Sequence, residues 1–237
     1  MSESLSDLVI VVPAAGVGAR MKASISKQYL LLGGIPILEH CLEKLHSLSP
    51  KNVVLVVSSE DQSWRSIPAA HKCLIVQGGS LRSDSVLNGL NAIDGNESDW
   101  IMVHDCVRPC FQIDDVKRLY NALKDHAVGG LLGVPVIDTL KQVHSQIEAA
   151  QIEVAQTCDR KQYWLAQTPQ MFRLGMLKKA LSQDGEFGDE ASAIEDLGYR
   201  PVMVEGNRHN IKITTQEDMA LAEFLIQIAR PVDREKA

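Results

Sequence analysis

A segment with few bulky side chains, followed by two cations, lies close to the amino terminus. Residues 11–21 read VVPAAGVGARM, and the small residues that end this apolar run are Pro13, Ala14, Ala15, Gly16 and Gly18. Without bulky side chains, successive backbone N–H groups can face an anion, and glycine permits its close approach. The guanidinium of Arg20 and the ammonium of Lys27 suit phosphate oxygens. The pattern therefore predicts a polyphosphate site.

Three alternatives fit this segment less well. A dinucleotide site requires G-x-G-x-x-G/A, but GVGARM places Met21 at the third position. Such a site also requires an acid roughly 20 residues later, whereas Glu60 and Asp61 come about 40 residues later. A P-loop kinase requires G-x-x-x-x-G-K-S/T, which the sequence lacks. An ordinary turn accounts for the glycines but not for the cations, so the residues favour a nucleotidyltransferase.

A second glycine pair follows another apolar run. The segment QGGSLRSDS comes directly after an expected strand. Gly78 and Gly79 therefore allow the backbone to approach a ligand closely. We expect this segment to form part of the same site.

An acid ends the apolar run WIMVHD, at Asp105. A carboxylate at the end of a strand suits a ligand cleft better than a core. Arg108 follows three residues later and is expected to position a substrate, although a purely structural Asp105–Arg108 ion pair is the alternative. His104 is expected to be a packed neighbour and not a catalyst.

Apolar β-rich runs alternate with segments of helical period along most of the chain. The expected strands are 8–16, 52–59, 73–79, 100–105, 164–172, 201–205 and 211–214. The expected helices are 36–48, the segments carrying Val86 to Ile93 and Ile113 to Leu123, then 173–182, 189–197 and QEDMALAEFLIQIA. Such alternation predicts an α/β fold, a mainly parallel twisted sheet with helices on both faces.

The pattern changes at about residues 135–160. VPVIDTLKQVHS and QIEVAQTCD flank QIEAA, polar and apolar residues alternate in places, and no convincing helix lies between them. We expect a protruding β-arm whose apolar face needs a partner. The 237 residues are expected to form a single domain, 1–237, that carries this arm.

The composition argues against several function classes. A formal net charge of −6 disfavours nucleic acid and anionic membranes as partners. The amino-terminal MSESLSDLV lacks the pattern of a secretory signal, and no apolar run approaches the roughly 18 residues of a membrane span. Five scattered cysteines are a poor framework for disulfides or zinc. We expect a cytoplasmic protein.

Seven motifs, in order over almost the whole chain, resemble one family. They are PAAGVGARM with KQY, GGSLRSDSVLNGL, VHDCVRP, DTLK, AQTPQMF, GDEASAIE and NIKIT. Together they closely resemble 2-C-methyl-D-erythritol 4-phosphate cytidylyltransferase. The resemblance implies a Rossmann-like nucleotidyltransferase fold and transfer of CMP from CTP to methylerythritol phosphate, with release of pyrophosphate, in the non-mevalonate isoprenoid pathway. It also implies Mg²⁺ held largely through the CTP phosphates, and a homodimer with composite active sites.

The resemblance also implies roles for individual residues. The expected catalytic residues are Arg20 and Lys27, which match the pair that stabilises the transition state, and Arg160 and Lys212, which match the pair that holds the attacking phosphate in line. The expected nucleotide-binding residues are Pro13, Ala14, Ala15, Gly16, Gly18, Gly78, Gly79, Ser80 and Ser85. The expected substrate-binding residues are Asp105, Arg108, Thr139, Arg160, Thr168, Gly188 and Lys212. Thr139 and Arg160 would come from the arm of the other subunit, and Asp105 at most would touch the metal.

Several positions differ from the family pattern or allow a structural role. Many relatives carry threonine where this chain has Gly188, so a hydroxyl contact to substrate is missing or replaced by a backbone N–H. The family often carries an acid at the position of Ser80, and Ser85 could merely belong to the following helix. Asp189 and Glu190 are expected to cap the helix at 189–197.

Two other functions stay open. A ribitol-5-phosphate cytidylyltransferase shares the fold and nucleotide, but usually reads AGG where this chain has AAG at 14–16. A non-catalytic nucleotide-sensing module would keep the glycines but need not retain all four expected catalytic cations. Their joint presence favours the enzyme.

Overall fold

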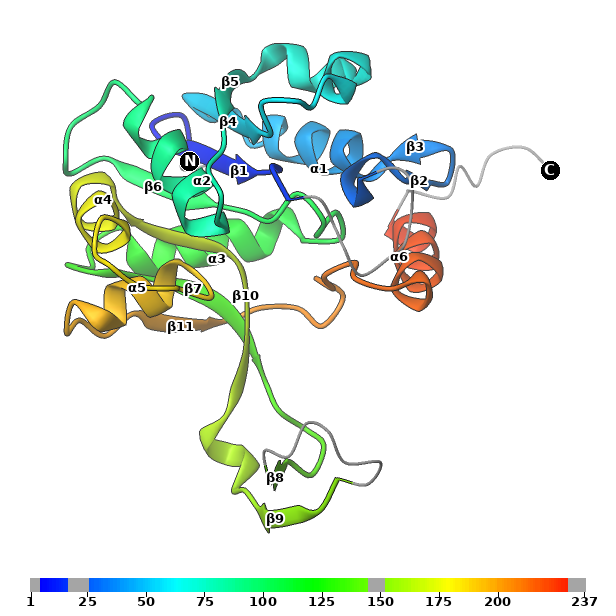
Figure 1. Ribbon diagram of the computed structural model, residues 1–237, viewed down its shortest axis with the longest axis vertical. Helices are drawn as coiled ribbons and strands as arrows, with labels where there is room; N and C mark the ends of the chain where they lie inside the picture. The colour runs from blue at the N-terminus through cyan, green and yellow to red at the C-terminus, as the bar shows by residue number, and fades with distance from the viewer. Residues whose placement is uncertain (1–4, 17–25, 145–151, 230–237) are drawn as a thin grey trace.

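The central element of the chain is a seven-stranded sheet with the strand order β11-β7-β10-β6-β1-β4-β5 (Figure 1). The computed structural model describes residues 5–16, 26–144 and 152–229. The strands are β1 (Val9–Pro13), β4 (Asn52–Val57), β5 (Leu74–Gln77), β6 (Trp100–Val103), β7 (Gly129–Pro135), β10 (Trp164–Arg173) and β11 (Val202–Glu205). β10 is antiparallel to both of its neighbours and all other pairs are parallel. The predicted fold class is confirmed.

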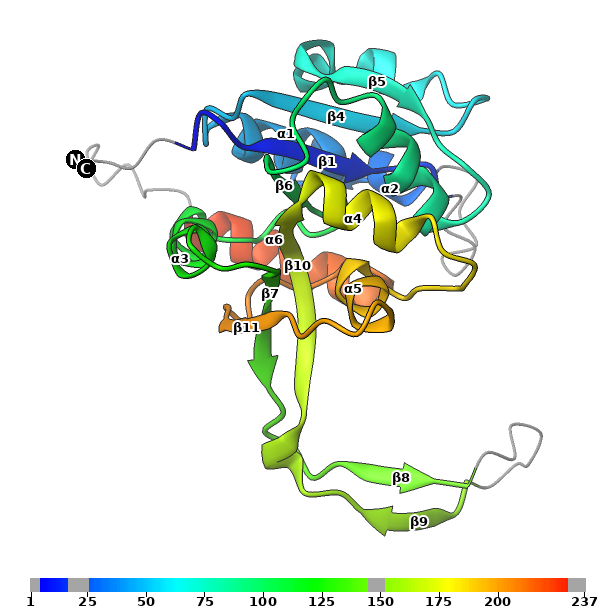
Figure 2. The ribbon, with the colours of Figure 1, turned by 90° about the vertical axis from the view of Figure 1, so that its left-hand side faces the viewer.

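Helices cover both faces of this sheet (Figure 2). One face packs against α1 (Ile37–His46) and α3 (Ile113–Leu123), and the other against α2 (Arg82–Asn91), α4 (Leu174–Leu181) and α5 (Glu190–Asp196). Successive strand residues point to opposite faces, so Ile10 joins the core under α1 whereas Val11 joins the core under α2. Burial on both sides explains why β1 is a continuous apolar run.

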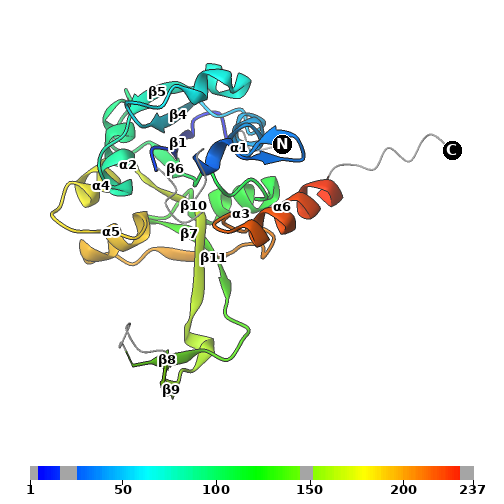
Figure 3. The ribbon, with the colours of Figure 1, turned by 45° about the vertical axis from the view of Figure 1, so that its right-hand side comes forward.

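The last helix, α6 (Gln216–Ala229), lies beside a short hairpin formed by β2 (Leu31–Leu32) and β3 (Ile35–Pro36) (Figure 3). Gly33 and Gly34 form the hairpin turn with φ values of 59° and 82°. A turn with positive φ at both central residues favours glycine, and it matches the twist of the strands that it joins. This hairpin was not predicted from the sequence, although Gly-Gly between two apolar pairs is a signal for it.

The expected β-arm projects from one side of the sheet (Figures 1 and 2). β7 and β10 pair beyond the edge of the body, and β8 (Lys141–Val143) pairs antiparallel with β9 (Val154–Thr157) at the far end. A short 3₁₀ turn, η5 (Arg160–Gln162), leads back to β10. The arm exposes large apolar side chains, namely Ile137, Val143, Ile152, Val154, Tyr163, Trp164 and Leu165. Residues 145–151, which include QIEAA, lie outside the described residues.

Some expected elements differ from the structure. The strand expected at 211–214 is wrong, because Ile213 is held by a single backbone bond, its N–H donating to Val107 O at 2.9 Å, and not by a ladder. The start of β7, at Gly129, was not predicted, because glycine is uncommon in strands. Glycine is needed there, since an added Cβ would lie 2.3 Å from Met171 O. The 3₁₀ turns η3 (Ser63–Ser66) and η4 (Pro68–Lys72) were not expected. In the described parts of the chain, every helix is too short or too polar to cross a bilayer.

Candidate active site

A cavity of about 240 Å³ lies beyond the carboxyl ends of β1 and β6. Parallel sheets commonly bind ligands at this edge. The loop after β1, the 3₁₀ turn η2 (Lys27–Tyr29), the start of α2 and the loop after β6 form its wall. The lining residues expected to bind nucleotide are Pro13, Ala14, Ala15, Gly16, Gly79, Ser80 and Ser85.

The loop after β1 is tied to the turn that carries Lys27. Ala14 N–H donates to Val56 O at 2.7 Å, and Ala14 O accepts a bond from Gln28 Nε2 at 2.9 Å. Gln28 is buried, so its amide fixes η2 against the loop, and Lys27 Nζ donates to Thr214 O at 3.2 Å. This role of Gln28 was not predicted from the sequence. Gly18 and Arg20 lie outside the described residues.

The second glycine pair packs directly against the first loop. A Cβ at Gly78 would lie 2.5 Å from Ala15 Cβ and 2.8 Å from Ser85 Oγ, so glycine is required for this approach. Gly79 N–H donates to Ser85 Oγ at 3.1 Å, and that hydroxyl donates to Leu81 O at 3.0 Å. Ser85 is buried, and these two hydrogen bonds of its hydroxyl anchor the loop that contains Gly79. Ser80 is exposed and donates to Asp84 Oδ2 at 2.8 Å.

Asp105, just after β6, is surrounded by three cations although its side chain is only 8% exposed. Its Oδ1 accepts from Arg82 Nη2 at 3.0 Å, and its Oδ2 lies 2.8 Å from Lys212 Nζ and 3.6 Å from Arg108 Nε. Burial would raise the pKa of Asp105, but Arg82 and Lys212 outweigh burial and hold the pKa well below its usual range. A negative charge is thus fixed in the cavity wall.

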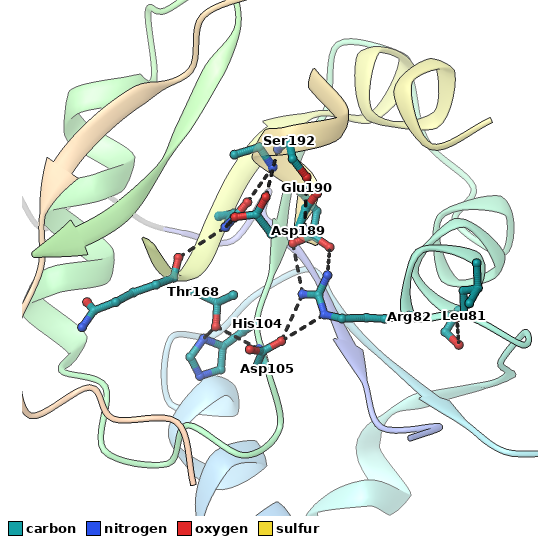
Figure 4. Close-up of polar contacts among 12 residues, drawn as sticks. Leu81, Arg82, His104, Asp105, Thr168, Asp189, Glu190 and Ser192 are labelled. Atoms are coloured by element: carbon teal, nitrogen blue, oxygen red, sulfur yellow. Dashed lines mark hydrogen bonds and ion pairs between the residues drawn. The ribbon is translucent and has the colours of Figure 1, made fainter. Parts of the chain in front are cut away.

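Arg82 also binds a second carboxylate, that of Glu190 (Figure 4). Nη1 donates to Glu190 Oε1 at 2.6 Å and Nη2 donates to Oε2 at 3.2 Å. Glu190 lies in the first turn of α5, as expected, but its side chain is fully buried against Arg82 and does not supply the cap. Asp189 does cap α5, since its side chain accepts from Ser192 N–H at 2.9 Å. Arg82 was not predicted as a site residue from the sequence.

A second cavity, of about 370 Å³, shares the Arg82, Asp105 and Lys212 wall with the first. Its other lining residues include Arg108, Thr168 and Gly188, which were expected to bind the second substrate. The structure therefore gathers Asp105, Arg108, Thr168, Gly188 and Lys212 at one place. Two cavities with a common charged wall can hold two ligands side by side.

Behind this wall lies a buried polar layer. Thr168 Oγ1 accepts from Asp105 N–H at 3.0 Å and lies 3.1 Å from His104 Nδ1. His104 is fully buried, as expected for a packed neighbour, and burial lowers its pKa to about 4. Asn210, which the sequence analysis missed, donates from Nδ2 to Thr168 O at 2.8 Å and accepts at its backbone oxygen from Arg108 Nη1 at 2.7 Å. The layer fixes the backbone on both sides of Asp105.

Thr139 and Arg160 lie on the arm, outside the two cavities that the described residues form. Both side chains are exposed, and Arg160 Nη1 donates to Ile137 O. Within one chain they are therefore not brought to Lys27 and Lys212.

The residues at the shared wall fit a divalent cation only in part. Among the described residues, no group of three or more His, Cys, Asp or Glu side chains could hold a metal. Asp105 faces both cavities, but cations occupy both of its oxygens. Such a wall fits Mg²⁺ that takes most of its ligands from phosphate and water.

A Rossmann-like sheet with small residues after its first central strand, a lysine beside them and a second cationic cavity is typical of nucleotidyltransferases. A sequence model of the 2-C-methyl-D-erythritol 4-phosphate cytidylyltransferase family matches residues 8–228. The chain belongs to this family. The predicted family and its class of enzyme are confirmed.

Individual relatives support the same assignment. The chain is 44% identical to the 2-C-methyl-D-erythritol 4-phosphate cytidylyltransferase of Vibrio atlanticus, over 95% of this chain and 98% of that protein. It is 45% identical to the protein of the same name from Hahella chejuensis, over 93% of each chain. The crystal structure of the Francisella tularensis enzyme of that name superposes with a TM-score of 0.77 at 36% identity, and covers 93% of this chain and 100% of that chain.

Proposed function

We propose that this cytidylyltransferase binds CTP in the first cavity and 2-C-methyl-D-erythritol 4-phosphate in the second, and joins them across the Arg82–Asp105–Lys212 wall. The observation that carries this proposal is that the two cavities share these three residues. The cytidine would lie against the Gly78–Ser85 loop, where backbone groups can pair with the base. The triphosphate would lie along Ala14, Ala15 and Gly16 after β1, beside Lys27, and Arg20 is proposed to bind it as well.

The reaction is an in-line displacement at the α-phosphorus of CTP. An oxygen of the substrate phosphate forms a new bond to the α-phosphorus. The bond from the α-phosphorus to the oxygen that bridges it to the β-phosphorus breaks, and pyrophosphate leaves with that oxygen. A phosphate monoester is already ionised near neutral pH, so the step needs no general base. Lys27 and Arg20 would stabilise charge on the nucleotide, while Lys212 and Arg108 would hold the incoming phosphate.

Mg²⁺ is part of this proposal. The ion supplies neutralisation of the triphosphate charge when it is bound. Asp105 is the described carboxylate of the shared wall that could contact it, directly or through water. The ionised state of Asp105, which Arg82 and Lys212 maintain, suits that contact.

The complete site would be composite. The exposed apolar residues of the arm need a partner, and a two-fold homodimer would exchange two equivalent arms. Thr139 and Arg160 would then reach the second cavity of the other copy. The net charge of −6 disfavours nucleic acid and anionic membranes as partners, so the anionic substrates would have to be met by local cations. The five free thiols support a cytoplasmic location.

The substrate assignment is tested by incubating the protein with CTP, Mg²⁺ and one polyol phosphate at a time, and measuring pyrophosphate. We expect release with 2-C-methyl-D-erythritol 4-phosphate and background release with ribitol 5-phosphate. Release with ribitol 5-phosphate alone would replace the proposed acceptor, and tight CTP binding without any release would favour the sensing module. Chelation of divalent cations should abolish release.

The composite site is tested by mixing two inactive variants, Lys27→Ala and Arg160→Ala. In a mixed dimer, the body of the Arg160→Ala chain meets the intact arm of the Lys27→Ala chain, and one complete site results. Random exchange should restore about one quarter of the wild-type rate. If each chain used its own Arg160, mixing would restore nothing. Sedimentation analysis of both variants checks that they still form dimers.

A further inference from the structure

Arg82 binds two carboxylates at the shared wall, yet neither the expected catalytic set nor the expected binding set includes it. Its Nε and Nη2 donate to Asp105 Oδ1 at 3.3 and 3.0 Å. Its Nη1 and Nη2 donate to the two oxygens of Glu190 at 2.6 and 3.2 Å. One planar guanidinium therefore joins the carboxylate of the active-site wall to a carboxylate on another helix (Figure 4).

Glu190 is held rigidly in turn. It is the first residue of α5, and its side chain is fully buried. The start of α5 is fixed to β10, because Gln170 Nε2 donates to Asp189 Oδ2 at 2.8 Å and Ala191 N–H donates to Gln170 Oε1 at 2.8 Å. Gln170 itself is only 1% exposed. The position of Glu190, and with it that of Arg82, is thus set by the core of the sheet.

An ion pair with a fully buried carboxylate is a poor device for stability alone, even though Arg82 itself is 28% exposed. Desolvation of both charges offsets most of their attraction, and apolar side chains of similar volume often stabilise a fold as well or better. The pair here joins α2, which follows the glycine loop of the first cavity, to α5, whose Ser192 lines the second cavity. Its placement points to a role in the reaction.

The two oxygens of Asp105 contact different cations. Oδ1 accepts only from Arg82, whereas Oδ2 faces Lys212 and Arg108 among the described residues. If Arg82 were absent, Lys212 and Arg108 alone would have to neutralise this buried carboxylate. Their charge would then be less available to an acceptor phosphate.

We infer that Arg82, anchored by Glu190, is a positioning residue of the transfer reaction. It fixes the carboxylate of Asp105 between the two cavities and thereby leaves Lys212 and Arg108 free to hold the acceptor phosphate. The inference rests on the proposed assignment of the second cavity to the acceptor.

The test compares the steady-state kinetics of Arg82→Gln, Arg82→Lys and Glu190→Gln with those of the wild type. We expect kcat to fall at least tenfold and KM for the polyol phosphate to rise at least fivefold, while KM for CTP changes less than threefold. Lysine keeps the charge but cannot bridge two carboxylates in the way that the planar guanidinium does. The kcat of Arg82→Lys should therefore recover less than half of the difference between Arg82→Gln and the wild type. The double variant Arg82→Gln/Glu190→Gln should lose less than the product of the single losses, because both residues act through Asp105.

Asp115→Asn is the matched control for a general loss of stability. Asp115 is also a buried carboxylate paired with an arginine, its Oδ1 lying 2.5 Å from Arg118 Nη2, but it lies on α3 away from both cavities. This variant should lose stability without any change in either KM. A Glu190→Gln variant that is folded and keeps wild-type kcat and KM values overturns the inference, as does a kinetic change that Asp115→Asn reproduces.

Crystal structures of the variants give a readout that does not depend on turnover. We expect the carboxylate of Asp105 to rotate toward Lys212 in Arg82→Gln. An unmoved Asp105 contradicts the inference even if activity falls. A wild-type protein that released no pyrophosphate with CTP and methylerythritol phosphate would instead overturn the proposed function, while the movement of Asp105 would still decide the positioning role. If Arg82→Gln does not fold, the same measurement on Arg82→Lys decides.

Discussion

Lys212 Nζ lies 2.8 Å from Asp105 Oδ2, and the two partners differ sharply in exposure. The Asp105 side chain is 8% exposed, whereas that of Lys212 is 44% exposed. The carboxylate is therefore fixed by its surroundings, while the lysine can turn toward a ligand without leaving the wall that the two cavities share.

Replacement of Lys212 should separate activity from stability. We expect Lys212→Ala to lower kcat by about a hundredfold or more, since a cation that meets charge in the transition state is removed. The free energy of unfolding in urea should change by less than about 1 kcal/mol, because the pair is partly exposed and Arg82 still neutralises Asp105. Lys117→Ala, which removes an exposed lysine of α3, is the matched control and should change neither quantity. Near-normal turnover by Lys212→Ala would contradict the assignment.

A threonine at position 188 should improve use of the acceptor. A Cβ added at Gly188 would meet no atom within 4 Å, so the larger side chain fits at the border of the second cavity. Gly188→Thr should lower KM for methylerythritol phosphate by roughly fivefold, the effect of one additional hydrogen bond of about 1 kcal/mol. Gly188→Val has the same shape without the hydroxyl and should not lower KM. Equal effects of threonine and valine would exclude the hydroxyl as the cause.

The stability of the protein should fall in mild acid because of His104. Burial lowers the pKa of this residue to about 4, whereas an unfolded histidine titrates near 6.5. Between these two pH values the unfolded chain binds more protons than the folded one, so the free energy of unfolding decreases as pH falls. The loss should reach about 3 kcal/mol between pH 7 and pH 4.

Urea unfolding of His104→Gln measures this contribution, since the variant should lose most of the pH dependence above pH 4.5. His71→Gln, at an exposed histidine, should retain it. A further decrease below about pH 4 is expected from Asp105, whose pKa is held below its ordinary value, so its stabilisation is lost only in stronger acid. Identical pH profiles for wild type and His104→Gln would count against this account.

The contact between the two glycine-containing loops should be sensitive to a single methyl group. In Gly78→Ala the new Cβ would lie 2.5 Å from Ala15 Cβ, and the loops must separate. We expect KM for CTP to rise at least tenfold and the free energy of unfolding to fall by about 1–3 kcal/mol, the usual range for overpacking. The double variant Gly78→Ala/Ala15→Gly removes one partner of the clash and should recover part of the loss. No recovery would place the main strain at Ser85 Oγ, which lies 2.8 Å from the added Cβ.

Local features of the site could be predicted from the sequence. The glycine and alanine loop after β1 and the cap at Asp189 depend on neighbouring residues, and short motifs report such neighbours directly. The helices at Leu174–Leu181 and Gln216–Ala229 agree with their expected ranges, since amphipathic period is also a local property.

Long-range pairs could not be predicted in this way. Arg82 and Glu190 are 108 positions apart, and nothing next to Glu190 in the chain shows that its side chain is buried. Acids at a helix start usually face solvent, so a cap was the natural expectation. The segment of Ile213 has the alternation of a strand, but tertiary packing buries this residue without giving it a strand partner. The antiparallel direction of β10 likewise follows from its connection through the arm.

β10 belongs to the arm and to the core at once. It starts at Trp164 and Leu165, which are exposed, and near its other end Met171 and Phe172 are fully buried. The pairing of β10 with β7 shifts register between Ala166 and Gln170. Thr168 lies within this interval, and its hydroxyl accepts a hydrogen bond from Asp105 N–H. A second molecule that bound the exposed first residues of this strand would therefore constrain the same strand that carries Thr168, beside Asp105. Association of two chains through their arms would then be transmitted directly to the place where the acceptor phosphate would bind.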